Sequence, residues 1–211
     1  MTEQAWVLAT RNTGKLRELR PIFEQAGIPV IDLATAGIPE TAAEAEVESF
    51  DTFEDNALAK ARWFAARAGG RPVIADDSGL EVEALGGAPG VRSRRWSGRE
   101  DLSGDALDAA NNALLLARME GVLDRRARFV CAAAWTDGAR EVVVRGEVPG
   151  EIVEAGHEKG MHGFGYDPLF HSHELGVTLA EATVPQKQSV SHRGRAFAAL
   201  LARLRQLTGS S

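Results

Sequence analysis

The chain has 211 residues, 44% of them hydrophobic and 26% charged, and a formal net charge of −6 at pH 7. This composition is that of an average globular protein, long enough for one substantial core or two small lobes. The acidic balance argues against non-specific DNA or RNA binding, because that function needs a basic surface to neutralise backbone phosphates. A small anionic ligand is still compatible with it, given a local cluster of cations or a divalent metal ion.

Cysteine content and hydropathy indicate the compartment. Cys131 is the only cysteine, so no disulfide can form within the chain, and its apolar surroundings, RFVCAAAW, indicate a buried small residue. The N-terminus, MTEQAWVLAT, lacks the basic region and long apolar stretch of a secretion signal, and no window approaches the length of a membrane span. We therefore expect a soluble cytoplasmic protein that binds neither nucleic acid nor membranes.

The N-terminal part is predicted to begin with a strand, a turn and a helix. Residues 5–10 are apolar and compatible with a strand, and residues 16–26 place apolar side chains at helical spacing until Gly27. Pro21 lies inside this helix and removes a hydrogen bond, so we expect a kink or a late start.

A second helix is better marked. Thr52 and Asp55 have the spacing of a capping box, apolar residues follow on one face, and Gly69-Gly70 ends the pattern. The next segment, RPVIADDSG, is predicted to be a buried strand that runs into two carboxylates and a glycine.

The remaining elements predict a mixed sheet. A Gly/Pro-rich loop at 85–98 precedes a helix from about 105 to 119, and strands at 127–135 and 140–148 flank an Asp-Gly turn typical of a hairpin. A long loop, 154–170, then leads to a C-terminal helix with a core-facing stripe of Phe197, Leu200, Leu201, Leu204 and Leu207. Parallel βα units early and an antiparallel hairpin later indicate a mixed α/β sheet.

The turn in LATRNTGKLRE has the composition of a phosphate-binding turn. Backbone N–H groups at a helix N-terminus attract anions, Gly14 permits close approach, and Lys15 adds a positive charge. A Walker A loop is excluded, because Ala9 stands where its first glycine belongs and Leu16 where its Ser or Thr belongs. Taken alone, the turn is also compatible with a plain connection that carries a surface lysine.

The carboxylates of IADDSG lie where open α/β sheets place ligands, at the carboxyl end of an apolar strand. Asp76 and Asp77 repel each other unless a cation or solvent separates them, and such a pair suits Mg²⁺. A haloacid-dehalogenase-type phosphatase is disfavoured, since it needs D-x-D and Ser78 occupies the second acidic position. A capping or turn role without a metal is the simpler alternative.

A lysine and a glutamate near this region have open roles. Asn56 and Lys60 are four residues apart on one helical face, which fits either a surface pair or a further contact to phosphate. Glu48 lies upstream in a presumed loop, and its neighbours in the sequence do not decide whether it is a ligand.

Two C-terminal motifs have features of a nucleobase site. In HGFGYDPLF, glycines alternate with aromatic residues, which suits ring stacking and backbone hydrogen bonds, although a tight loop with core aromatics has the same pattern. In KQSVSHRGRAF, Ser191 is a predicted N-cap and His192 and Arg193 occupy the first turn. Cations there oppose the helix dipole, which favours a ligand role for Lys187, His192 and Arg193.

The order of these motifs is more specific than any one of them. ATRNTGKLRE, TFEDNALAKA, IADDSGLEVEALGGAPGVRS, GFGYDPLF and SHRGRA together resemble the inosine triphosphate pyrophosphatase family and span residues 5–200. The resemblance implies one bilobed domain over residues 1–211, with a long mixed sheet flanked by helices and an active-site cleft between two lobes. It also implies a homodimer that hydrolyses ITP, dITP and XTP to the monophosphate and pyrophosphate with Mg²⁺, which keeps these nucleotides out of DNA and RNA.

The resemblance also assigns residues. Asp77 would be the general base and a metal ligand, Glu48 the second metal carboxylate, and Ser78 a substrate contact. The triphosphate would be bound by Thr10, Arg11, Asn12, Thr13, Gly14, Lys15 and Lys60. The base would be bound by Phe164, Gly165, Tyr166, Asp167, Lys187, His192 and Arg193. The sequence departs from the family pattern at Pro21 and in the basic segment VRSRRWSG.

Two other functions compete with this one. A pyrophosphatase of the related septum-inhibitor type would prefer modified pyrimidines, and a catalytically silent nucleotide sensor would bind without turnover. The aspartate pair favours catalysis, because without a metal its charge would repel a triphosphate.

Overall fold

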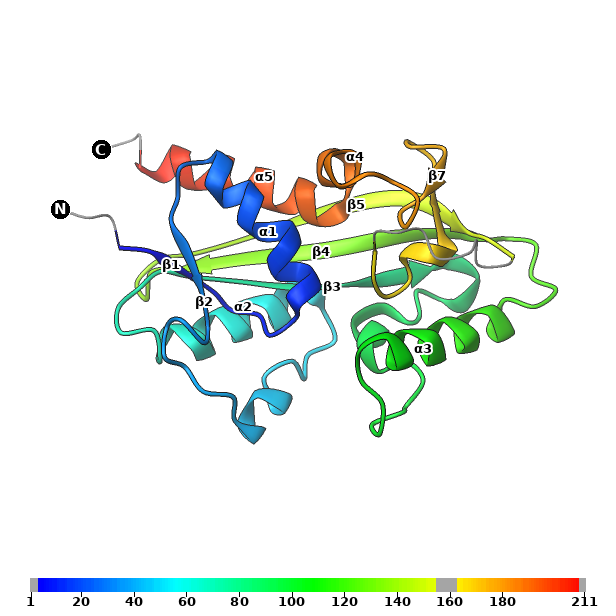
Figure 1. Cartoon of the computed structure of the whole chain (residues 1–211), viewed down its shortest axis with the longest axis horizontal. Helices are drawn as coiled ribbons and strands as arrows, with labels where there is room; N and C mark the ends of the chain where they lie inside the picture. Colours follow the sequence, from blue (N-terminus) through cyan, green and yellow to red (C-terminus); the bar gives the residue numbers. More distant parts are fainter. Residues whose placement is uncertain (1–3, 155–162, 209–211) are drawn as a thin grey trace. The chain divides into compact units, whose positions relative to one another are not determined.

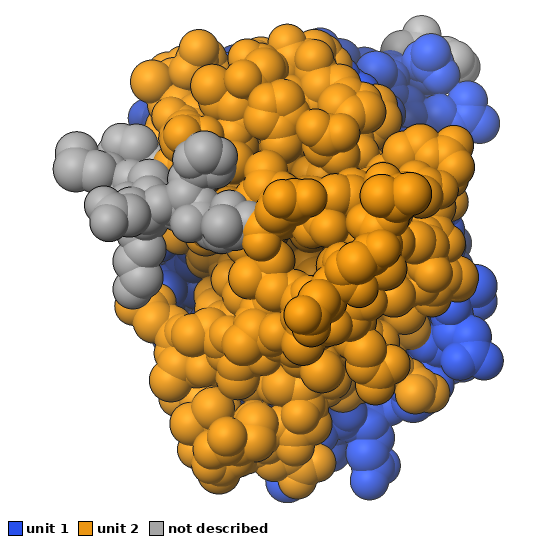
Figure 2. Space-filling view, turned by 90° about the vertical axis from the view of Figure 1, so that its right-hand side faces the viewer, with its two compact units in different colours: residues 1–77, 131–146, 193–211 blue, residues 78–130, 147–192 orange. Residues whose placement is uncertain are grey.

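The computed structural model describes residues 4–154 and 163–208, which fall into two compact units (Figure 2). Unit 1 is formed from residues 1–77, 131–146 and 193–211, and unit 2 from residues 78–130 and 147–192. The segment 155–162, which belongs to the predicted loop 154–170, lies outside the described residues.

The described residues form an open seven-stranded sheet in the order β2-β1-β3-β4-β5-β6-β7. Strand β1 pairs in parallel with β2 and β3, whereas β6 pairs antiparallel with β5 and β7. The strands are β1 (Trp6–Leu8), β2 (Val30–Asp32), β3 (Val73–Val82), β4 (Arg126–Thr136), β5 (Glu141–Ile152), β6 (Phe170–Ser172) and β7 (Val177–Thr178). The predicted mixed α/β sheet is confirmed, and the Asp-Gly turn joins β4 to β5 as expected.

Helices flank this sheet (Figure 1). The α-helices are α1 (Thr13–Gln25), α2 (Phe53–Ala65), α3 (Gly104–Arg118), α4 (Val184–Val190) and α5 (His192–Thr208). Short 3-10 helices occupy Ala42–Glu46, Glu83–Leu85, Gly90–Arg95 and Asp167–Leu169. None of the helices in the described part of the chain is long and apolar enough to cross a membrane.

In unit 1, α1 and α5 cover one face of the strands and α2 covers the other (Figure 1). The rings of Phe23 in α1 and Phe197 in α5 pack edge to face with 5.7 Å between their centroids. They share one core cluster with Leu8 and Ile74. Burial of each such side chain contributes about 1.5–3 kcal/mol. Leu207, predicted in the core stripe, is 38% exposed because it lies in the last turn of α5, beyond the buried Leu204.

Unit 2 has its own core. Leu115 of α3 and Met119, the residue that caps its C-terminus, pack with Leu80 of β3, Phe129 of β4 and Phe170 of β6. Each unit therefore buries a separate apolar cluster.

Three local differences from the sequence expectations affect the site. Helix α1 begins at Thr13, so Pro21 lies inside it and no late start occurs. Strand β3 continues past the aspartates to Val82, whereas we expected the strand to end at them. The short elements β6, β7 and α4 were not predicted, because two to seven residues are too few to show a period.

Candidate active site

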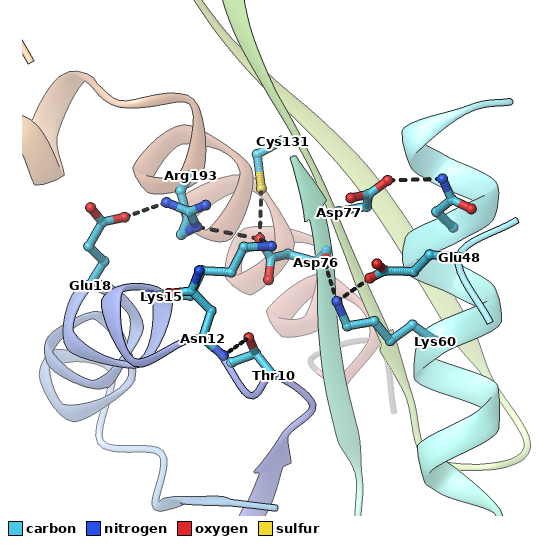
Figure 3. A network of polar contacts seen from close by, with 11 residues as sticks. Thr10, Asn12, Lys15, Glu18, Glu48, Lys60, Asp76, Asp77, Cys131 and Arg193 are labelled. Carbon is cyan, nitrogen blue, oxygen red and sulfur yellow. Dashed lines mark hydrogen bonds and ion pairs between the residues drawn. The ribbon is translucent and has the colours of Figure 1, made fainter. Parts of the chain in front are cut away.

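Two adjacent aspartates in the middle of β3 face different surroundings within unit 1 (Figure 3). Successive side chains of a strand point to opposite faces, so Asp76 points toward α1 and α5 and Asp77 toward α2. Strand β1 pairs with β3 only as far as Ile74, so its carboxyl end stops just before the aspartates. The turn that follows β1 therefore reaches them.

Asp76 is the anion of a buried ion cluster. Its Oδ2 lies 2.9 Å from Lys15 Nζ and accepts hydrogen bonds from Arg193 Nε at 3.4 Å and from the Cys131 thiol at 3.9 Å. Burial alone would raise the pKa of Asp76, but the charges of Lys15, then Arg193 and Lys60, outweigh it and hold the pKa below its usual range. Asp76 therefore stays ionised, and Cys131 is buried as predicted.

Asp77 has a different electrostatic balance. Its Oδ2 accepts a hydrogen bond from Asn56 Nδ2 at 3.0 Å. Burial raises the pKa of Asp77 to about 6, Lys15 and Lys60 oppose that rise, and the negative charge of Glu48 adds to it. A carboxyl group that changes protonation near neutral pH is suited to act as a general base.

Lys60 of α2 connects the aspartates to Glu48. Its Nζ donates to Glu48 Oε1 at 2.5 Å and to the backbone carbonyl of Asp76 at 2.9 Å. Burial would raise the pKa of Glu48, but Lys60 and Lys15 lower it overall, so Glu48 is a carboxylate. Asn56 and Lys60 therefore do not form the surface pair that we considered, since both side chains bond to groups of this site, and a contact of Lys60 with phosphate stays a prediction.

The turn before α1 is built as a helix N-terminus. Asn12 caps α1, with its Oδ1 accepting from the N–H of Lys15 at 3.0 Å, and Thr10 Oγ1 accepts from the N–H of Asn12 at 3.2 Å. Thr13 is exposed and Gly14 is buried in the first turn. Arg11 donates to Glu44 and to the carbonyl of Ile38, so its guanidinium is bound to the segment before α2.

A second set of predicted residues lies in unit 2. Asp167 Oδ2 accepts from the N–H of Phe164 at 2.8 Å and from Lys187 Nζ at 2.7 Å, and Lys187 Nζ lies 5.1 Å from the centre of the Phe164 ring. The ring of His192 stacks on Phe129 with 4.7 Å between centroids. The structure therefore brings Phe164, Asp167 and Lys187 together as one group.

The helix-dipole argument for Lys187 was wrong. Lys187 lies in the last turn of α4, where a cation is favourable, and not at the start of α5. The sequence contained a signal for this helix, because Thr183 and Gln186 form a capping box. His192 and Arg193 do open α5, directly after the extended Ser191.

Arg193 contacts residues that the sequence did not connect with it. Besides Asp76, its guanidinium donates to Glu18 of α1. Two pairs of neighbouring candidate residues are divided between the units. Asp77 belongs to unit 1 and Ser78 to unit 2, and Arg193 belongs to unit 1 and His192 to unit 2. Sequence reasoning missed Glu18 as a partner of Arg193, and it singled out Asn56 without its bond to Asp77, because both pairs are distant in sequence.

Comparison with known proteins gives consistent matches. The model of the Ham1 family matches residues 6–203. The chain is 51% identical over 207 residues to a dITP/XTP pyrophosphatase of Mycobacterium tuberculosis, which covers 95% of each chain. It is 45% identical to a dITP/XTP pyrophosphatase of Burkholderia pseudomallei, which covers 95% of this chain and 93% of that protein.

Solved structures agree. The Ham1 protein of Staphylococcus aureus is similar with a TM-score of 0.80 at 37% identity and covers 96% of this chain and 99% of its own. A crystal structure named nucleoside-triphosphatase / dITP/XTP pyrophosphatase, from Mycobacterium abscessus, has a TM-score of 0.71 at 43% identity, covering 96% and 100%.

Proposed function

Since the chain belongs to the Ham1 family, we propose that it hydrolyses the non-standard purine nucleoside triphosphates ITP, dITP and XTP to the nucleoside monophosphate and pyrophosphate. The resemblance read from the motifs is confirmed by this match, and the chain is a nucleoside triphosphate pyrophosphatase. The observation that carries the chemistry is the contrast on β3, where Asp76 is bonded to the cations Lys15 and Arg193 while the neighbouring Asp77 is bonded to the neutral amide of Asn56.

The triphosphate is assigned to the residues around Asp76. Lys15 and Lys60 would contact phosphate oxygens, together with the backbone N–H groups of the turn and with Thr10, Asn12, Thr13 and Gly14. Arg11 would contribute through its backbone, because its guanidinium is bound to Glu44. Asp76 is a positioning residue here, since its bond to Lys15 Nζ fixes where that charge stands.

The carboxylates of unit 1 fit a divalent cation whose remaining coordination positions are filled by the phosphates of the substrate. Mg²⁺ takes one or two carboxylates and fills its other positions with phosphate oxygens and water. Asp77 and Glu48 would supply the carboxylates, and they are close enough for Glu48 to raise the pKa of Asp77. Among the residues that the structure describes, no group of three or more His, Cys, Asp or Glu could hold a metal alone.

The reaction would be an in-line attack of water on the α-phosphorus. The metal, when bound, would neutralise charge on the departing pyrophosphate. Asp77 would accept the proton of the attacking water, which is worth roughly 10²- to 10⁴-fold in rate. Lys15 and Lys60 would stabilise the charge that develops on the phosphate oxygens. Ser78, next to Asp77 on β3, is a proposed substrate contact.

Selection of the base is assigned to residues 164–167 with Lys187, His192 and Arg193. Phe164 offers a ring for stacking, and His192 or Arg193 would donate a hydrogen bond to the 6-oxo group of hypoxanthine or xanthine. The 6-amino group of adenine cannot accept that bond. Each mispaired contact costs ~1–3 kcal/mol, so two of them give discrimination on the order of 10² to 10⁴.

One experiment tests the proposal against its competitors. The protein is incubated with dITP, XTP, dATP, dGTP and dUTP plus Mg²⁺, and both phosphate and pyrophosphate are measured. We expect pyrophosphate, mainly from dITP and XTP. Phosphate alone, or equal rates on dATP and dITP, would contradict the proposal. A preference for dUTP would favour a pyrimidine-selective enzyme, and binding without turnover would favour a sensor.

The assembly is also a proposal. A homodimer and one bilobed domain with a cleft are expected from the family resemblance. Light scattering coupled to size-exclusion chromatography tests the dimer, for which a mass of twice 22.6 kDa is expected.

A further inference from the structure

The loop Gly163–Asp167, here called the base loop, is held by two side chains of α3 within unit 2. Asp108 Oδ2 accepts a hydrogen bond from the N–H of Gly165 at 2.7 Å. Asn112 Nδ2 donates to the carbonyl of Gly165 at 3.0 Å. Asp108 and Asn112 are one helical turn apart, so they lie on the same side of α3. Both backbone polar groups of a single residue are thus bonded by neighbouring positions of one helix.

Gly165 is a residue that needs such support. Its φ of +62° is in the left-handed region, which favours glycine. Its N–H and C=O belong to no helix or strand, so side chains or water must satisfy them.

The rest of the base loop is fixed from other directions. Tyr166 donates its hydroxyl to the carbonyl of Ser93 at 2.8 Å. Phe164 and Lys187 both donate to Asp167 Oδ2. The contacts from α3 therefore fix the backbone of Gly165, the residue between Phe164 and the anchored Tyr166.

Helix α3 is itself well anchored. Asn111 accepts from the N–H of Ser97 at 2.8 Å and donates to the carbonyl of Arg94 at 3.0 Å. Leu115, further along the helix, and Met119, which caps its C-terminus, are almost fully buried in the core of unit 2. A side chain on this helix can consequently hold the base loop in a defined place.

We propose that Asp108 and Asn112 are positioning residues for nucleobase selection, and that they act through the two backbone groups of Gly165 to set the Phe164 ring. This inference rests on the proposed function, in which the base loop contacts the purine. Neither residue is assigned a contact with phosphate, so their effect is confined to which base is accepted.

The test measures kcat/KM for dITP and for dATP in the same enzyme preparation and compares their ratio. The ratio does not depend on the fraction of active enzyme, so it stays informative when a variant folds poorly. Asp108→Leu and Asn112→Leu remove one bond each and should lower the dITP to dATP ratio about tenfold, mainly through a higher KM for dITP.

Two control variants separate geometry from charge and from general damage. Asp108→Asn retains an oxygen acceptor for the N–H of Gly165 and should keep the ratio within about twofold of the wild type. Asp105→Asn changes an exposed carboxylate in the first turn of the same helix and should leave the ratio unchanged. The double variant Asp108→Leu/Asn112→Leu should lose less than the product of the single effects, because both bonds hold one residue.

The outcomes are distinguishable. If the Leu variants lower kcat/KM for dITP and dATP by the same factor, the two residues are merely structural and the inference is overturned. It is also overturned if the ratio falls equally in Asp105→Asn. A wild-type protein that releases no pyrophosphate from dITP would instead overturn the proposed function.

Discussion

Asn56 and Asp77 are joined by a buried hydrogen bond of 3.0 Å from the amide Nδ2 to the carboxylate Oδ2. The same amide also binds both backbone groups of Phe50, accepting from its N–H at 2.9 Å and donating to its carbonyl at 3.1 Å. Asn56 therefore connects α2 to the aspartate of β3 and to the segment that carries Glu48. One neutral side chain thus bonds directly to Asp77, a proposed metal ligand, and to the backbone two residues after Glu48, the other proposed ligand.

Replacing Asn56 with leucine tests this connection. The change keeps a similar volume but removes the partner of both backbone groups of Phe50, at a cost of about 1 kcal/mol for each lost bond, because these groups are only partly buried. We expect a lower Tm and, because the ligands lose their positions, a kcat reduced at least about tenfold. Thermal unfolding and steady-state kinetics with dITP measure the two effects.

Thr52→Ala is the matched control for Asn56. Thr52 caps the same helix, and its side chain accepts from the N–H of Asp55, so its loss should cost ~1 kcal/mol of stability without lowering kcat. Equal losses of kcat in both variants would mean that Asn56 acts only through the stability of α2.

Asp77→Asn should separate stability from activity. The folded-state pKa of Asp77 is raised from 3.8 to about 6, so the folded state binds this proton more tightly than the unfolded state. The contribution of Asp77 to the free energy of unfolding is therefore fully present below about pH 3.8. It falls by on the order of 3 kcal/mol as the pH rises through about 6.

The Asp77→Asn variant has no carboxyl group at this position, so it does not lose stability as the pH rises through about 6. In the absence of divalent metal, it should be more stable than the wild type at pH 8, similar at pH 4, and inactive at both. Urea unfolding in EDTA at the two pH values measures this. A variant that is less stable than the wild type at pH 8, or that keeps its activity, would remove Asp77 from its proposed role.

The sequence predicted the parts of this site that depend on local pattern. The apolar face from Phe53 to Phe64 marked α2, and Gly14-Lys15 marked the turn. The opposite orientations of Asp76 and Asp77 follow from the period of a strand, but only once β3 is known to continue past them. The continuation was missed because DDSG has the composition of a turn.

Other contacts had no local signal. Asn56 and Asp77 are 21 positions apart, and Arg193 and Asp76 are 117 apart. Such pairs form because α2 and α5 pack on opposite faces of the unit 1 strands, which a single sequence does not specify. Helix α4 carried a capping box, yet its seven residues show too short a pattern to separate Lys187 from the start of α5.

Asp76→Asn should behave in the opposite way from Asp77→Asn. Asp76 is the shared anion of Lys15 and Arg193, and its removal leaves two buried cations with less compensation, a loss of about 3–5 kcal/mol. Its folded-state pKa is lowered, so its stabilisation is present above pH 3.8 and is lost as the pH falls below that value.

Unfolding free energies measured at pH 7 and at pH 3 check this sign. The stability gap between the wild type and Asp76→Asn should be large at pH 7 and smaller at pH 3. Arg20→Gln is a suitable control, because Arg20 forms an exposed pair with Asp32 and its loss should cost at most about 1 kcal/mol. A gap that does not change with pH would mean that Asp76 stabilises the fold through packing rather than through its charge.

The pair of Asp167 and Lys187 allows the base site to be altered without touching the residues around Asp76. Their side chains are only 5% and 9% exposed and lie 2.7 Å apart. Lys187→Met leaves a buried carboxylate that has lost its cation, and should destabilise the protein by about 3–5 kcal/mol.

The double variant Asp167→Asn/Lys187→Met removes both charges and should recover most of that stability, because no buried charge is then uncompensated. It should not recover the preference for dITP over dATP, since the lysine and carboxylate beside Phe164 are gone. Chemical unfolding and the ratio of kcat/KM for the two nucleotides measure these effects separately. A double variant that regains the wild-type preference would show that this pair holds the fold and takes no part in recognising the base.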